Sequence, residues 1–303
     1  MDDEILRLKA QLRQATEAEL AERVRQHQLR VDRIRAGVRN RETLQLAVPE
    51  TPLDFLAIGD SWFEYPLSDD GLPLPFWNAA IVGRKQLQSM GNPPPLVLSH
   101  ALHGQAMTAI LSWRNQERFI QAITDKTRWV NGKPDAILLS GGGDDIVGDQ
   151  FAIYVDYGGG GLDKDRFQGL LASVEASYKD LFALRDRFLP DTPIFAHCYD
   201  YAIPNEVHPI FSGPWLQPPL HFAGYTYSQG LAIVKDAIDG FHQLLSKLAD
   251  GRNFILVDTR GTLTRDASRP MGWANEIHPY TAGFTALAHK FLVALQGRFP
   301  GRI

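Results

Sequence analysis

The chain has 303 residues, of which 44% are hydrophobic and 22% are charged, and its formal net charge is −4. This composition fits a globular protein with one large core; it excludes a low-complexity chain and gives no reason to expect nucleic acid as a partner. Cys198 is the only cysteine, so no internal disulfide forms. Residues 2–4 are acidic, unlike a secretory signal, and no apolar run approaches the roughly 18 residues that span a bilayer. We therefore expect a cytoplasmic protein.

Residues 4–40 predict a long amphipathic helix, because they contain no proline and their apolar residues recur mostly at spacings of three, four and seven. The part from 23 to 41 holds seven arginines and one acidic residue, Asp32. We divide the chain into an amino-terminal helical arm, 1–48, and a domain, 49–303. The arm is expected to pack on the domain, or to form a homo-oligomer or partner contact through residues 1–45. Contact with an anionic membrane surface is the less favoured alternative.

From residue 53 onward, short apolar runs alternate with longer helical patterns. The predicted strands are 53–58, 96–99, 136–140, 193–196 and 254–257. The predicted helices are 76–90, 105–129, 163–188, 227–249 and 281–299. Parallel strands need helical crossovers, so this alternation predicts an α/β fold: a three-layer α/β/α sandwich around a five-stranded parallel sheet.

Two connections, 62–77 and 199–222, are long and rich in aromatic residues. Both follow predicted strands, so both should overhang the cleft at the carboxyl edge of the sheet. Packing of the rings within each loop is the alternative. The residues that we expect to bind substrate are Trp62, Phe63, Tyr65 and Trp215.

Residues that could take part in catalysis lie after the predicted strands and before the last predicted helix. Gly59-Asp60-Ser61 ends the first strand, Gly104 follows the second, the segment 141–145 follows the third, and His278 precedes the last helix. In a parallel sheet these places converge on one rim. A serine hydroxyl is a poor nucleophile at neutral pH and needs a base within hydrogen-bond reach, which His278 can supply.

In this order the four segments resemble the sequence blocks of the GDSL or SGNH hydrolases, which are named for a serine, a glycine, an asparagine and a histidine. The resemblance covers about residues 53–297. It implies a flavodoxin-like sheet and an esterase or lipase that cleaves a small-molecule or lipid ester through an acyl-enzyme; we expect no cofactor and no metal. Ser61 would be the nucleophile and His278 the base. The backbone N–H groups of Ser61 and Gly104, with the side chain at position 144, would form the oxyanion hole.

The sequence departs from the family pattern at two positions. Asp144 stands where the family has asparagine; an ionised aspartate would repel an oxyanion, whereas a protonated one could donate to it. The site would then work with a neutral aspartic acid, work with two backbone donors, or have lost hydrolytic activity. Asn275 stands where the family usually has the aspartate of the catalytic triad, and it can orient an imidazole but cannot stabilise imidazolium as a carboxylate does. We expect a serine–histidine dyad with neutral support and weakened or unusual activity.

Two other functions fit the sequence. Asp60, Asp144 and Asp145 could bind Mg²⁺ in a metal-dependent phosphoesterase, which would explain Asp144 but leave Gly104 and His278 without a role. The protein could also be a non-catalytic scaffold assembled through the helical arm.

Overall fold

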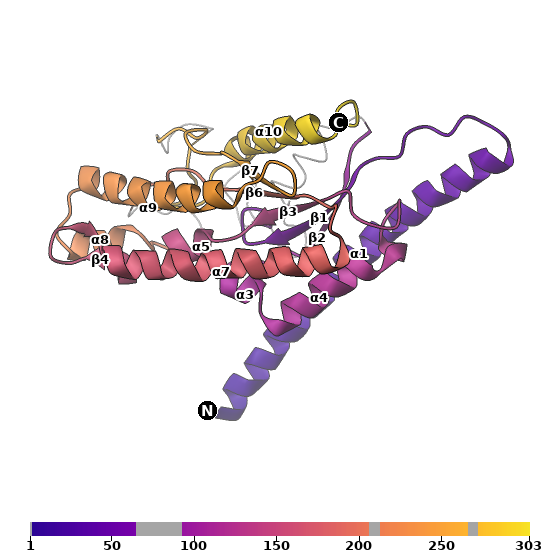
Figure 1. Cartoon of the computed structure of the whole chain (residues 1–303). Coiled ribbons are helices and arrows are strands. Elements are labelled where there is room, and N and C mark those ends of the chain that lie inside the picture. The colour runs from indigo at the N-terminus through magenta and orange to yellow at the C-terminus, as the bar shows by residue number, and fades with distance from the viewer. Residues whose placement is uncertain (1, 65–92, 206–212, 266–271) are drawn as a thin grey trace.

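The computed structural model describes residues 2–64, 93–205, 213–265 and 272–303, which are the coloured parts of the ribbon in Figure 1. Its main sheet has five strands in the order β2-β1-β3-β6-β7, and every neighbouring pair is parallel. The strands are β1 (Asp54–Gly59), β2 (Leu96–Ser99), β3 (Ala136–Ser140), β6 (Ile194–His197) and β7 (Phe254–Val257). The predicted α/β fold and its five strands are confirmed, with shifts of one residue in β1 and β6.

Both faces of the sheet are buried, which explains why its strands are apolar throughout. Successive side chains point to opposite faces of a strand. In β1, Leu56 and Ile58 join one hydrophobic cluster while Phe55 and Ala57 join another. A one-residue shift in register would exchange the two sets, so the packing fixes the register and with it the position at which β1 ends.

Helices cover the two faces as separate layers (Figure 1). The first layer contains α4 (Trp113–Thr124), α7 (Lys164–Phe188) and α9 (Tyr227–Leu248), whose buried side chains share the cluster of Leu56 and Ile58. On the other face, Phe291 and Leu295 of α10 (Thr281–Arg298) pack in the cluster of Phe55 and Ala57. The predicted helix 76–90 lies outside the described residues.

The segment predicted as one helix over 105–129 forms three elements. They are α3 (Met107–Ile110), α4 and the 3-10 helix η1 (Lys126–Arg128). The break after α4 has a local cause: Asp125 is extended, and its side chain accepts a hydrogen bond from the Thr127 backbone N–H, which starts a new turn. The elements that the sequence patterns did not predict are short: α5 (Gly143–Val147), α6 (Phe151–Tyr154), α8 (Gln217–Phe222) and the antiparallel pair β4 (Val155–Asp156) and β5 (Gly161–Leu162).

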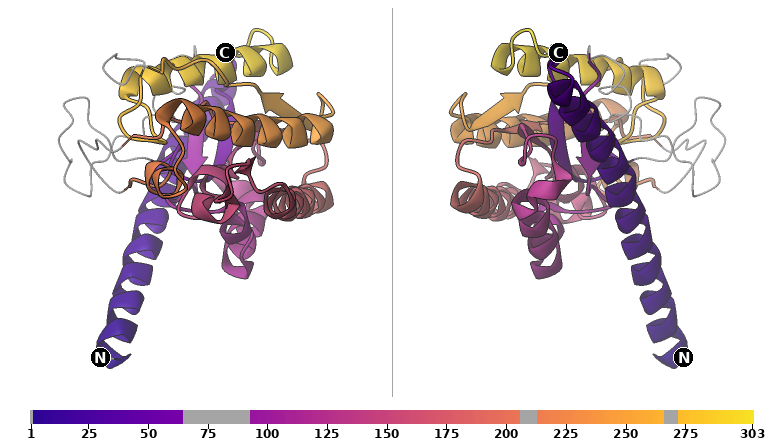
Figure 2. Two further views of the ribbon diagram at one scale, coloured as in Figure 1. Left: turned by 90° about the vertical axis from the view of Figure 1, so that its left-hand side faces the viewer. Right: turned by 90° about the vertical axis from the view of Figure 1, so that its right-hand side faces the viewer.

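The amino-terminal arm is one helix, α1 (Asp2–Thr43), which lies beside the edge strand β2 and η1. Leu20, His27 and Val31 are buried on the side that faces the domain. The amino-terminal part of α1 extends away from the rest of the protein (Figure 2), and Leu8 and Leu12 there are 56% and 62% exposed. The middle of the arm therefore packs on the domain and covers a sheet edge. A homo-oligomer or partner contact through residues 1–45 stays a prediction.

In the part of the chain that the structure describes, no helix is both long enough and apolar enough to cross a membrane.

Candidate active site

The turn after β1 places Ser61 at the carboxyl edge of the sheet. Gly59 has φ +139°, and a Cβ at this position would lie 2.0 Å from the carbonyl oxygen of Ser140 on the neighbouring strand. Only glycine allows the two strands to approach so closely here. The backbone N–H of Asp60 then donates to the same Ser140 oxygen at 2.9 Å, so the turn is held against β3 and Ser61 follows directly.

Ser61, His278 and Asn275 form a hydrogen-bonded series. Ser61 Oγ lies 2.6 Å from Nε2 of His278, and Nδ1 of the same ring lies 3.1 Å from Oδ1 of Asn275. Oδ1 of Asn275 also accepts the backbone N–H groups of Ile277 and His278, which fixes the orientation of the amide. Because an amide oxygen only accepts hydrogen bonds, Nδ1 carries the proton and the lone pair of Nε2 faces the serine hydroxyl. This is the tautomer that a general base requires.

Burial keeps the imidazole neutral. His278 is 4% exposed, and desolvation, followed by the repulsive charge of His103, lowers the pKa of His278 to about 3. A group with this pKa is unprotonated over the whole neutral range, so the imidazole that faces Ser61 is neutral.

The carboxylate of Glu276 fixes the backbone around His278. Glu276 is fully buried and accepts hydrogen bonds from four backbone N–H groups across the chain: Asn205 at 3.0 Å, Leu216 at 2.8 Å, Gln217 at 2.8 Å and Trp215. Backbone donors that converge on one carboxylate satisfy its charge without a cation. These hydrogen bonds join the segment of His278 to the aromatic loop 199–222. The centroid of the Trp215 ring lies 6.2 Å from that of the imidazole.

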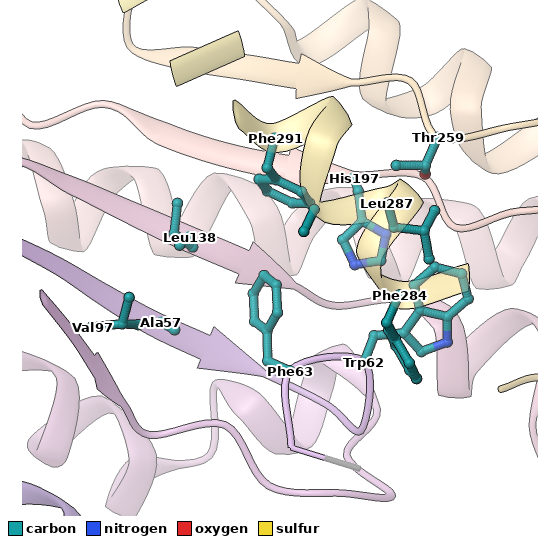
Figure 3. Close-up of a pocket in the computed structure, with 11 residues that line it drawn as sticks. Ala57, Trp62, Phe63, Val97, Leu138, His197, Thr259, Phe284, Leu287 and Phe291 are labelled. Atoms are coloured by element: carbon teal, nitrogen blue, oxygen red, sulfur yellow. The ribbon is translucent and has the colours of Figure 1, made fainter. Parts of the chain in front are cut away.

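Trp62 connects the nucleophile turn to the histidine segment. Its indole N–H donates to the carbonyl oxygen of Ile277 at 3.0 Å, and its ring stacks on His197. Trp62 and Phe63 are only 7% and 8% exposed, and they line an apolar pocket beneath α10 (Figure 3). Of the residues expected to bind substrate, these two therefore lie in the core, Trp215 lies beside His278, and Tyr65 lies outside the described residues.

The carboxylate of Asp60 is held by three donors: the hydroxyls of Ser140 and Tyr199 and, at 3.0 Å, the backbone N–H of Trp62. Nε2 of His197 lies 2.9 Å from the Ser140 hydroxyl and extends the network. Burial raises the pKa of Asp60 to about 6, against these hydrogen bonds, which favour the ionised form. Asp60 thus stabilises the turn beneath Ser61.

Asp144, in α5, lines a small pocket together with Ser61, Asp60 and Tyr199. Its Oδ2 atom is buried and has no hydrogen-bond partner among the described residues. Burial first, and then the charges of Asp60, Asp145 and Asp149, raise the pKa of Asp144 to about 8. The Asp144 carboxyl is therefore mostly neutral at pH 7. The Asp60 carboxylate carries the charge instead, because three hydrogen-bond donors stabilise it.

The glycine segment is tied to the nucleophile turn. Beyond the end of β2, the backbone N–H of His100 donates to Ala57, and that of Leu102 donates to the carbonyl oxygen of Gly59 at 2.9 Å. Gly104, with φ +70°, follows two residues later. The structure thus brings Ser61, Asn275 and His278 into direct contact, places Asp144 in the pocket of Ser61, and holds the segment of Gly104 beside the turn.

The described residues contain no group of three or more histidine, cysteine or acidic side chains arranged to hold a metal ion. The carboxylate of Asp145 instead accepts the backbone N–H of Met107 at 2.6 Å. The phosphoesterase alternative stays a prediction.

The fold and this site define an α/β protein with a serine–histidine pair at the carboxyl edge of a parallel sheet. No protein-family profile matches the sequence, and no curated protein matches it. Among solved structures, the chain is similar to the lipase Lip_vut3 from a goat rumen metagenome, with 15% identity and a TM-score of 0.50 over 80% of this chain and 97% of that one. It is also similar to an extracellular lipase from Streptomyces rimosus, with 14% identity and a TM-score of 0.50 over 81% of this chain and 99% of that one. The chain thus shares the α/β/α fold of these two lipases.

Glu276→Gln tests the role of the buried carboxylate. Glutamine has one acceptor oxygen, so at least one of the four converging N–H groups would face an NH₂ group. We expect the free energy of unfolding to fall by about 2 kcal/mol or more in chemical denaturation. Glu175→Gln, which affects only an exposed pair with Lys179 on α7, is the control and should be near neutral. Equal stabilities of the two variants would contradict this role.

Proposed function

We propose that the protein is a serine hydrolase that cleaves carboxylic esters through an acyl-enzyme. The observation that carries the proposal is the 2.6 Å contact between Ser61 Oγ and His278 Nε2, with Nδ1 held by Asn275. A neutral imidazole with its lone pair aimed at a serine hydroxyl is the arrangement that activates a nucleophile. The fold that the chain shares with the two similar lipases supports the same chemistry.

In the first half-reaction, Oγ of Ser61 attacks the ester carbonyl carbon while Nε2 of His278 takes the hydroxyl proton. The tetrahedral intermediate collapses, the proton passes from Nε2 to the leaving alcohol, and the acyl group stays on Oγ. Water then repeats the sequence and releases the acid. Asn275 supports the imidazolium with a dipole rather than a full negative charge, so we expect slower turnover than a carboxylate at this position would give.

The oxyanion of the intermediate needs fixed donors. We assign this role to the backbone N–H groups of Ser61 and Gly104 and to the protonated carboxyl of Asp144. Among the described residues, the buried Oδ2 of Asp144 in the pocket of Ser61 has no hydrogen-bond partner, which supports the third assignment. A neutral carboxylic acid donates one O–H hydrogen bond, and its burial suppresses the ionisation that would turn it into a repulsive charge.

The proposal is tested with a fluorophosphonate probe and a short chromogenic ester. The wild-type protein should be labelled at Ser61 and should hydrolyse the ester, and Ser61→Ala should do neither. His278→Ala should slow hydrolysis by about 10²–10⁴-fold, the usual contribution of a general base. Ser177→Ala, which removes a buried hydroxyl on α7 that donates to the carbonyl oxygen of Ser173 on the same helix, is the control and should behave like wild type. A folded wild-type protein that is neither labelled nor active would overturn the proposal.

The pH dependence tests the neutral state of Asp144. The pKa of about 8 means that the donor is present below pH 8 and is replaced by a negative charge above it. The value of kcat/KM should therefore fall about tenfold for each pH unit above 8. Asp144→Asn keeps an amide donor at every pH, so it should be at least as active as wild type at pH 7 and lose the decline at high pH. A variant that is slower at pH 7, or that declines in the same way, would show that Asp144 acts differently.

A further inference from the structure

One arginine of the helical arm reaches into the neighbourhood of the active site. The side chain of Arg23 in α1 is 13% exposed. Its Nη1 donates to the carbonyl oxygen of Ala101 at 2.8 Å and lies 3.3 Å from Oε1 of Glu64, while Nη2 pairs with Glu19 on the same helix. The guanidinium thus joins the arm to two segments of the domain.

Both segments belong to the candidate active site. Glu64 closes the nucleophile turn, since its backbone N–H donates to the carbonyl oxygen of Ser61 at 3.1 Å. Ala101 lies in the segment that leads from β2 to Gly104, directly before the Leu102 N–H that donates to Gly59. Arg23 therefore bridges the turn that carries the nucleophile and the segment that carries one proposed oxyanion donor.

The buried carboxylate of Glu64 and the geometry of the guanidinium explain why an arginine occupies this position. The side chain of Glu64 is 3% exposed, and a buried carboxylate is costly unless a cation or several donors compensate its charge. Arginine presents several N–H donors in a rigid fork, so one side chain can bind a carboxylate and a carbonyl oxygen at the same time. The neighbouring Arg25 also pairs with a glutamate of its own helix, Glu22, but its side chain is 58% exposed.

We propose that Arg23 is a positioning residue of the active site, through which the docked arm holds the Ser61 turn and the Gly104 segment in register. This inference rests on the proposed hydrolase function and deepens it. The arm is then part of the catalytic unit rather than an appendage, because a cation that faces the buried Glu64 carboxylate comes from α1.

The test compares Arg23→Gln and Arg23→Lys with the control Arg25→Gln in the full-length chain. Arg23→Gln should lower kcat on the chromogenic ester by about tenfold with a smaller change in KM, because a small misplacement of reacting groups weakens the transition state. Arg23→Lys keeps the charge but not the fork and should recover part of the loss. Arg25→Gln should match wild type. Hydrogen exchange measured on the same samples should be faster in Arg23→Gln at residues 60–64 and 99–104, with β3 and β6 unchanged.

The exchange measurement separates this inference from the proposed function. A wild-type protein without ester hydrolysis would overturn the hydrolase, and the exchange of the two segments would still decide the role of Arg23. Wild-type exchange and wild-type kcat in Arg23→Gln would overturn the positioning role. A uniform rise in exchange over the whole chain, equal in Arg23→Gln and Arg23→Lys, would also overturn it, because it would show a general loss of stability.

Discussion

The hydrogen bond between Ser61 and His278 joins residues that are 217 positions apart, and most of the site's remaining structure serves to hold its two ends. The serine end depends on Gly59, where the contact with β3 leaves no room for a side chain. The histidine end depends on backbone N–H groups gathered by Asn275 and Glu276. Trp62 then links the two ends directly through its bond to Ile277. A base that must lie within about 3 Å of its nucleophile needs this degree of fixation.

Burial sets the charge of each group around this bond. Desolvation lowers the pKa of His278 and raises those of Asp144 and Asp60, so it favours the neutral form in all three cases. Asp60 differs from Asp144 because three hydrogen-bond donors hold its carboxylate. The charge on Asp60 in turn favours the protonated form of Asp144. Two acids of the same type thus differ in charge, an ionised Asp60 and a neutral Asp144, because their hydrogen-bond partners differ.

The sequence predicts the sheet well, because buried parallel strands are short apolar runs between helices. It also predicts that Ser61 and His278 lie at one edge, since strand ends determine that placement. It does not reveal the partners that tertiary structure brings in. Glu276 is visible beside His278, but its four donors come from a distant loop. Arg23 is one of seven arginines in a basic stretch, and nothing in the linear pattern separates it from Arg25. The composition of their loop predicts that Trp62 and Phe63 bind substrate; both line a pocket beneath α10, and Trp62 also lines the pocket of Ser61.

The central claim is that Ser61 carries the acyl group during turnover, and the most direct measurement is a rapid-quench reaction with an activated p-nitrophenyl ester followed by mass spectrometry. The account predicts a burst of close to one equivalent of nitrophenol, with the acyl group found on Ser61 and lost with time as water completes the reaction. Two results would contradict it. One is turnover without a burst and without an acyl adduct on Ser61 at any quench time, even under conditions that slow deacylation. The other is an acyl adduct on a different residue.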